Sequence, residues 1–241
     1  MRILAESRRR IAAYLAGLVF VAVLNLLVPK IIPLYNTTTL GYSVLLIIWT
    51  VTIRMRVVDR EQRALFFFGG ALWLLLFFTR FLKYRTAEYN PEAARYLWYF
   101  YYLPFALAPA VTLHSSIVLG NRQSGRKTPH SLPQAIWIFS GLLAVMVVTN
   151  DLHRLVFRFD SVEGYASYHY GPGYWVIIGW SILGLLVSFI IYQVKCSRTI
   201  GWHRIVPVVI GAAGIALLVW YVIEGGSPKV GGISLYNIQE V

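Results

Sequence analysis

The chain of 241 residues is 58% hydrophobic and 13% charged, and its formal net charge is +12. This much apolar sequence exceeds what a water-soluble core needs, so the composition excludes an ordinary soluble domain. The single cysteine excludes an internal disulfide and a cysteine-built metal site. The positive charge does not indicate nucleic-acid binding, because Lys and Arg lie almost entirely between apolar stretches.

Long apolar runs follow one another along the chain, at residues 11–28, 40–53, 64–79, 96–120, 132–149, 174–194 and 205–223. A helix needs roughly 17–25 residues to cross a bilayer. Two runs, 40–53 and 64–79, are short. We expect residues 35–39 to extend the first and the stem of Arg80 to reach past the end of the second. The pattern predicts an all-α integral membrane protein, a polytopic bundle of about seven transmembrane helices.

The two ends of the chain carry separate expectations. Residues 1–28 are predicted to be a basic cytoplasmic start and a leading transmembrane anchor, uncleaved because no small-x-small cleavage site follows. Residues 29–241 are then the main membrane domain. After the glycine-rich stretch 225–232, residues 233–241 resume an apolar pattern. We expect them to be the start of an eighth helix that is truncated, which makes the chain incomplete at its C-terminus.

The loops between the runs predict an orientation. If the N-terminus is cytoplasmic, the same side receives the basic stretches 2–10, 54–63, 122–127 and 195–204, which hold most of the Lys and Arg. The sequence therefore predicts a multi-pass plasma-membrane protein with a cytoplasmic N-terminus. Residues 29–39, 80–95 and 150–173 become the outer loops.

The fourth apolar run carries two further signals. Aromatic residues crowd its outer end, as expected at a membrane interface; they include Tyr96, Trp98, Tyr99, Tyr101 and Tyr102. Pro104 and Pro109 follow inside the same run and predict a kink there.

Ionisable groups are scarce within the apolar runs, which hold no Asp, Glu, Lys or Arg and one histidine, His114. This argues against an ion-coupled carrier and against a retinal protein, which needs a lysine in its last helix. We expect His114 to be a neutral imidazole bonded to a neighbouring helix, unless it contacts a ligand.

The outer loop after residue 149 is the richest in chemistry. Asp151 and His153 are two residues apart, a spacing that does not match helical metal sites, so no metal is expected. Asn150 or Asp151 can cap a short interfacial helix with apolar positions at Leu152, Leu155, Val156 and Phe159. Residues 171–173 (Gly-Pro-Gly) predict a tight turn that starts the next helix. The loop is therefore either a capping structure or the floor of a binding pocket.

Two motifs in this loop resemble a known family. Thr149-Asn150-x-Leu152-His153-x-Leu155 is paired with Tyr170-Gly171-Pro172-Gly173-Tyr174-Trp175, as in the seven-helix N-terminal sensor region of bacterial histidine kinases. The resemblance covers the chain from about residue 40 to its end. It implies a two-component signalling protein of the bacterial plasma membrane, with 11–28 as an extra anchor and 233–241 as the seventh family helix. No phosphoacceptor helix or ATP-binding domain is present, so this chain alone is not expected to be an enzyme.

The leading hypothesis is a sensor module that detects an extracytoplasmic or membrane signal, either a small molecule or a peptide. The candidate ligand-binding residues are Asn150, Asp151, His153, Tyr170, Tyr174, Trp175, Trp98, Tyr101, Tyr102 and His114. The expected partners are the lipid bilayer, a downstream kinase domain or response regulator and, through the family analogy, a second copy of the chain. No catalytic residue, cofactor, metal or nucleic acid is expected.

Two other function classes remain open at this point. A permease for a small neutral solute is supported by Pro104, Pro109 and the glycines of the runs, and is opposed by the lack of an internal repeat. A membrane enzyme could use Asp151 and His153, but no nucleophile or metal set lies close by in sequence.

Overall fold

The computed structural model describes residues 37–57, 59–87, 89–119, 121, 130–159 and 168–197, with scattered positions before residue 21 and after residue 204. The chain forms two compact units, one of Met1–Thr52 with Trp220–Val241 and one of Ile53–Val219. Most of the apolar runs 11–28 and 205–223 lies outside the described residues, so the helices expected there stay predictions.

The first unit holds most of helix α2 (Thr37–Arg56) and a short antiparallel pair, β3 (Lys229–Val230) and β4 (Ile233–Ser234). Helix α2 extends the apolar run 40–53 on its N-terminal side, as expected, and also continues past the run to Arg56, which was expected to lie in a loop. The helix predicted to begin at residue 233 is wrong for Ile233 and Ser234, which form a strand. The reason is local, because a Gly-Gly pair between two short apolar segments favours a two-residue hairpin turn. Residues 235–241 lie outside the described residues.

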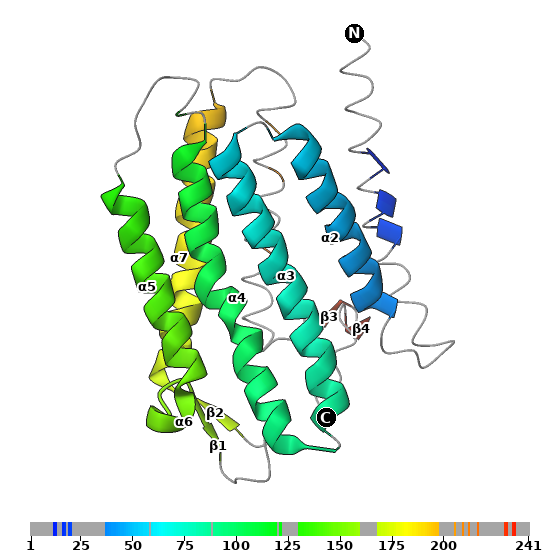
Figure 1. The fold of residues 1–241 in the computed structure, drawn as a ribbon, viewed down its shortest axis with the longest axis vertical. Coiled ribbons are helices and arrows are strands. Elements are labelled where there is room, and N and C mark those ends of the chain that lie inside the picture. Colours follow the sequence, from blue (N-terminus) through cyan, green and yellow to red (C-terminus); the bar gives the residue numbers. More distant parts are fainter. Residues whose placement is uncertain are drawn as a thin grey trace. The chain divides into compact units, whose positions relative to one another are not determined.

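The second unit is a helical bundle around α4 (Pro91–Val118), which contacts α3 (Arg60–Ala87), α5 (Ser131–Val148) and α7 (Pro172–Cys196). Figure 1 shows these long helices side by side. Three small elements, α6 (Asn150–His153), β1 (Phe157–Phe159) and β2 (Tyr168–Tyr170), lie together at one end of the bundle, the lower end in Figure 1. We name this end the hairpin end. The other end, where α3 starts and α4 stops, is the opposite end.

Helices α3 and α4 each begin before the apolar run that predicted them, and α3 also continues past the end of its run. The predicted outer loop 80–95 is wrong, because α3 continues to Ala87 and α4 begins at Pro91. Asn90 caps α4 by accepting the Ala93 N–H at 3.0 Å, with Pro91 in the first turn. Asp59 caps α3 in the same way through the N–H groups of Glu61 and Gln62. Polar residues thus accept the first free N–H groups of both helices.

Pro109 lies inside α4, which runs without interruption through it. A proline has no N–H, so the carbonyl of Phe105, four residues earlier, loses its helical donor. Ser181 of α7 supplies a replacement by donating its hydroxyl to that carbonyl at 2.6 Å. One turn further along α7, Gly184 lies so close that an added Cβ would be 2.5 Å from the Pro109 Cβ. The seam between α4 and α7 therefore depends on small residues opposite Pro109.

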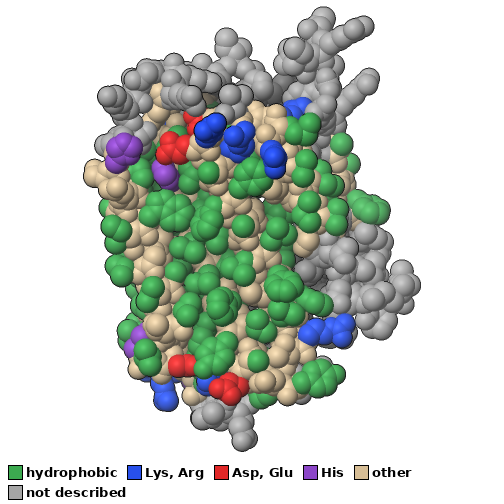
Figure 2. Space-filling model, viewed as in Figure 1, with side chains coloured by type: hydrophobic (Ala, Val, Ile, Leu, Met, Phe, Trp, Pro, Cys, Tyr) green, Lys and Arg blue, Asp and Glu red, His purple; other side chains and the backbone are tan. Residues whose placement is uncertain are grey.

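In this unit many large apolar side chains are on the surface and several polar side chains are in the interior, the reverse of a water-soluble protein. Three described helices, α3, α5 and α7, are long and apolar enough to cross a membrane. Large apolar side chains such as Ile138 and Leu142 are more than 60% exposed, whereas Ser140, Ser116 and Ser188 are buried. Figure 2 shows hydrophobic side chains over the middle of the helices, with charged side chains at the two ends. Such a surface fits lipid rather than water.

Candidate functional site

The segment after α5 does not form the amphipathic helix that its spacing predicted. Helix α6 contains four residues and ends at Arg154, whose φ of 52° is in the left-handed region. The chain then turns into β1, which pairs with β2 in the register Phe157↔Tyr170 and Phe159↔Tyr168. The physical reason lies in the alternating sequences Phe-Arg-Phe and Tyr-His-Tyr, which have the period of a strand.

Asn150 organises this turn from a fully buried position. Its Oδ1 accepts the N–H groups of Val156 and Phe157 at 2.9 and 3.0 Å. Its Nδ2 donates to the Phe157 carbonyl at 2.9 Å and to the Tyr99 hydroxyl at 3.2 Å. Through these bonds the amide holds α6 to β1 and to α4. The sequence predicted that Asn150 or Asp151 would cap a helix, but the Asn150 side chain does not do so. Its polar atoms are used within the protein, so it is a positioning residue.

Asp151 links the same segment to α4. Tyr99 donates its hydroxyl proton to Asp151 Oδ1 at 2.5 Å, and Arg95 Nη2 lies 3.4 Å from Asp151 Oδ2. Arg95 precedes the apolar run 96–120. Burial tends to lower its pKa, but the interaction with Tyr96 and the charge of Asp151 outweigh this, so the pKa of Arg95 is raised. The guanidinium therefore stays charged beside the carboxylate. We name Arg95, Tyr99, Asn150 and Asp151 the α4 clamp.

His153 points away from the α4 clamp. Its Nδ1 accepts the Leu155 N–H at 3.0 Å, and its Nε2 lies 3.3 Å from the Thr149 hydroxyl, which itself donates to the Val145 carbonyl. This network assigns the proton to Nε2. Asp151 and His153 thus bind different partners. Among the described residues, no three His, Cys, Asp or Glu side chains come together as a metal site would need.

The Gly-Pro-Gly turn starts α7, as predicted, and docks on the segment before β1. Gly171 N–H donates to the Val156 carbonyl at 2.8 Å, and Gly173 N–H donates to the Leu155 carbonyl at 2.9 Å. An added Cβ on Gly171 would lie 2.1 Å from the Leu155 oxygen. Only glycine fits there, because the two backbones are in direct contact.

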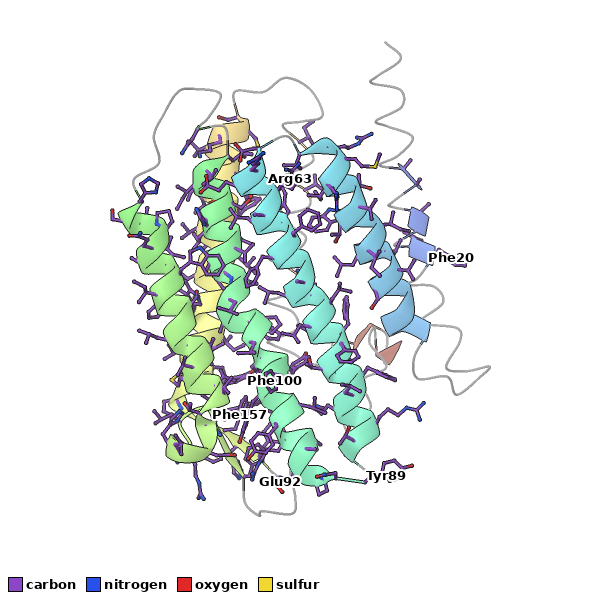
Figure 3. All side chains as sticks on the ribbon, viewed as in Figure 1. Phe20, Arg63, Tyr89, Glu92, Phe100 and Phe157 are labelled. Carbon is purple, nitrogen blue, oxygen red and sulfur yellow. The ribbon has the colours of Figure 1, made fainter. Side chains whose placement is uncertain are left out.

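Aromatic rings from α4, the hairpin and α7 fill the space beneath this turn. Phe157, labelled in Figure 3, is fully buried and lies 4.8 Å from Tyr102 between ring centroids. Tyr170 stacks on Tyr174 at 3.8 Å. We name this set the aromatic cluster; its members are Trp98, Tyr99, Tyr101, Tyr102, Phe157, Phe159, Tyr168, Tyr170 and Tyr174.

Lysine and tryptophan meet at the edge of the aromatic cluster. Trp98 is buried, and its ring lies 4.9 Å from that of Tyr168. The ammonium of Lys83, a buried residue of α3, lies 3.6 Å from the centre of the Trp98 ring. This is the geometry of a cation–π contact. Trp175, also a candidate ligand residue, contacts Tyr174 but is 59% exposed.

His114 lies at the opposite end, away from the other candidate residues. Its Nε2 is 3.1 Å from Glu61 of α3, and its Nδ1 accepts the indole N–H of Trp137 of α5 at 3.1 Å. The expected bond to a neighbouring helix is confirmed. The structure does not bring His114 together with the loop residues, so the candidates lie in two separate places.

A second polar group, which we name the junction, lies at the same end as His114; its members are Gln62, Ser115, Tyr192 and Lys195. Gln62 of α3 donates to the Ser115 hydroxyl at 2.5 Å, and that hydroxyl lies 2.6 Å from the hydroxyl of Tyr192 of α7. Lys195 donates to the carbonyls of Ile117 and Leu119 at the end of α4, at 2.5 and 2.8 Å. The junction therefore connects α3, α4 and α7 at the end where α4 stops.

Comparison with known proteins decides the family. Residues 44–238 match the model of the N-terminal 7TM region of histidine kinase, which is most of the chain. The chain belongs to this family. No curated protein and no solved structure matches it.

The 7TM region so identified contains both the α4 clamp and the junction, and it confirms the resemblance stated from the loop motifs. A membrane location follows from the family and from the apolar helices. The match covers no catalytic kinase domain, and nothing in these comparisons favours a permease.

Several residues of this 7TM region were missed by the sequence interpretation. Arg95, Tyr99 and Lys83 were assigned to a loop or to an interfacial belt, and the junction residues Gln62 and Tyr192 were not considered. The sequence Asn-Pro-Glu at 90–92 is a helix-start signal that could have placed Arg95 and Tyr99 one turn apart on α4. The partners of Lys83 and Gln62 depend on tertiary packing and carry no local signal.

Proposed function

We propose that the 7TM region detects a signal at its hairpin end and transmits it through α4 to the junction. The observation that supports this is the placement of bonds on α4. The α4 clamp attaches α6 and β1 to the first turns of α4, and the junction attaches the last turns of α4 to α3 and α7. One helix thus touches both polar groups.

A displacement of the hairpin end would act on α4 through few contacts. Tyr99 bonds to both Asn150 and Asp151, and Arg95 bonds to Asp151. A ligand that favours one position of the hairpin would therefore favour one position of α4, since a signal shifts an equilibrium only by its differential affinity for two states. The junction would carry this difference to the output domain that follows in histidine kinases.

The test is autophosphorylation of the protein with its native downstream sequence in nanodiscs. Tyr99→Phe and Asp151→Asn each remove a bond of the α4 clamp and are expected to change basal autophosphorylation about fivefold or more, the usual scale of coupling between sites. The control is Glu92→Gln, an exposed acid in the first turn of α4 at the same end. If Tyr99→Phe and Asp151→Asn autophosphorylate at the same rate as Glu92→Gln and the unmodified protein, the proposal is contradicted.

A further inference from the structure

Two buried donors on α4 lack a hydrogen-bond partner within the described part of the chain. They are the indole Nε1 of Trp98 and the Nε of Arg95. The two residues are three positions apart on α4, so they share one face of the helix. Trp98 itself is only 5% exposed. Buried donors are nearly always paired, which makes this face chemically incomplete.

The β-hairpin covers both donors at one cross-strand pair. The Arg95 guanidinium lies 5.9 Å from the Phe159 ring, and the Trp98 ring lies 4.9 Å from the Tyr168 ring. Phe159 and Tyr168 are partners in the β1–β2 register. The two donors therefore belong to one location between α4 and the hairpin.

The charge at this location is positive on two sides. The Lys83 ammonium lies over the Trp98 ring from α3, and Arg95 lies one turn before Trp98 on α4. Among the described residues, the carboxylate of Asp151 contacts Arg95 through Nη2, which leaves Nε as the donor without a partner in the described ranges. Donors and cations together favour an oxygen anion, and the aromatic rings around them favour an apolar body.

We propose, on the basis of the proposed sensor function, that the hairpin end binds a carboxylate with an apolar tail. Its carboxylate accepts from the Trp98 indole and the Arg95 Nε beside Lys83, and its tail packs on the Phe159–Tyr168 pair. Binding would hold the hairpin against α4 at the residues next to the α4 clamp.

The experiment uses the complete 241-residue chain in nanodiscs with ¹⁵N-labelled tryptophan and decanoate as the probe. The Trp98 indole N–H resonance is assigned by its loss in Trp98→Phe. We expect decanoate to move this resonance downfield with saturation, because the indole proton gains a charged acceptor. The exposed Trp175 indole serves as the reference in the same spectrum. Decanol and decyltrimethylammonium, which carry the same decyl chain into lipid, should leave the Trp98 resonance in place.

Variants of Lys83 test the role of charge. Lys83→Met should weaken decanoate binding about tenfold, and Lys83→Arg should retain it. An unchanged Trp98 resonance at saturating decanoate, or an equal response to decanol, would overturn the proposal. Asp160 and Glu163 are the two acids between β1 and β2 in the sequence. A shift of the ligand-free resonance in Asp160→Asn or Glu163→Gln would also overturn the proposal, since the acceptor would then be a carboxylate of the chain itself. If decanoate fails while Tyr99→Phe still alters autophosphorylation, only the ligand class is wrong and the sensor function stands.

Discussion

The two polar ends of the bundle are built in different ways. At the hairpin end, Asn150 and Gly171 bind mainly backbone atoms of the segment before and within β1. At the opposite end, Gln62, Ser115 and Tyr192 join three helices through side chains, and Lys195 adds bonds to the last carbonyls of α4. The hairpin end is therefore a turn that is bonded to α4 through the α4 clamp, whereas the junction bonds the helices to one another. This division suits a region that receives a signal and a region that passes it on.

The largest effect is expected where the hairpin end has no room to adjust. Gly171→Ala places a Cβ 2.1 Å from the Leu155 oxygen, so the backbone must move. We expect a loss of about 3 kcal/mol in the free energy of unfolding, at the upper end for overpacking. Thermal unfolding in detergent measures it. Gly179→Ala is the matched control, because nothing lies within 4 Å of its added Cβ on the same helix, and it should leave stability unchanged or raised.

Removing the buried amide at residue 150 should have the next largest effect. Asn150→Ala leaves the N–H groups of Val156 and Phe157 without their acceptor. Each buried donor left unsatisfied costs about 1–3 kcal/mol, so a loss of about 2 kcal/mol, the lower end for two donors, is expected. Hydrogen exchange should locate the change at residues 154–159 and leave the junction protected. Equal loss of protection at both ends would contradict the separation of the two regions.

The seam between α4 and α7, which lies between the two polar ends, can be tested by a double-mutant cycle. Ser181→Ala removes the donor to the Phe105 carbonyl and should cost about 1 kcal/mol. In a Pro109→Ala background the helix regains an N–H for that carbonyl, so Ser181→Ala should cost much less. Additive losses in the cycle would show that Ser181 does not compensate for Pro109.

The smallest expected effect is a gain. Arg154 has a φ of 52°, which costs a non-glycine residue about 1 kcal/mol. Arg154→Gly should therefore raise the free energy of unfolding by up to roughly 1 kcal/mol, measured by thermal unfolding. Arg158→Gly, an exposed position in the β1 strand, should instead lower it. A loss in Arg154→Gly would mean that the arginine side chain itself stabilises the turn.

The sequence predicted the described helices better than their ends. Apolar length was enough for α5 and α7, since hydrocarbon thickness sets it. It was not enough at residues 80–95, where polar turns of α3 and α4 continue past the apolar run and read as a loop. The short hairpin was missed because the helical spacing of Leu152, Leu155, Val156 and Phe159 competed with a strand period only three residues long.

The candidate site was predicted in part. The loop motifs identified Asn150, Gly171 and Tyr174 because turn chemistry is local in sequence. Residues such as Arg95 and Lys83 act through partners on other helices, which no single segment specifies. His114 was grouped with the loop residues because both are polar among apolar residues, although the helix places it at the other end.

The central claim is that the hairpin end and the junction are coupled through α4. Cys196, the only cysteine, follows Lys195 of the junction and can carry a trifluoroalkyl label. Fluorine NMR of the labelled chain in nanodiscs should show a changed resonance or a changed ratio of two resonances in Tyr99→Phe and Asp151→Asn, and none in Glu92→Gln. Identical spectra for all of these variants would contradict the coupling.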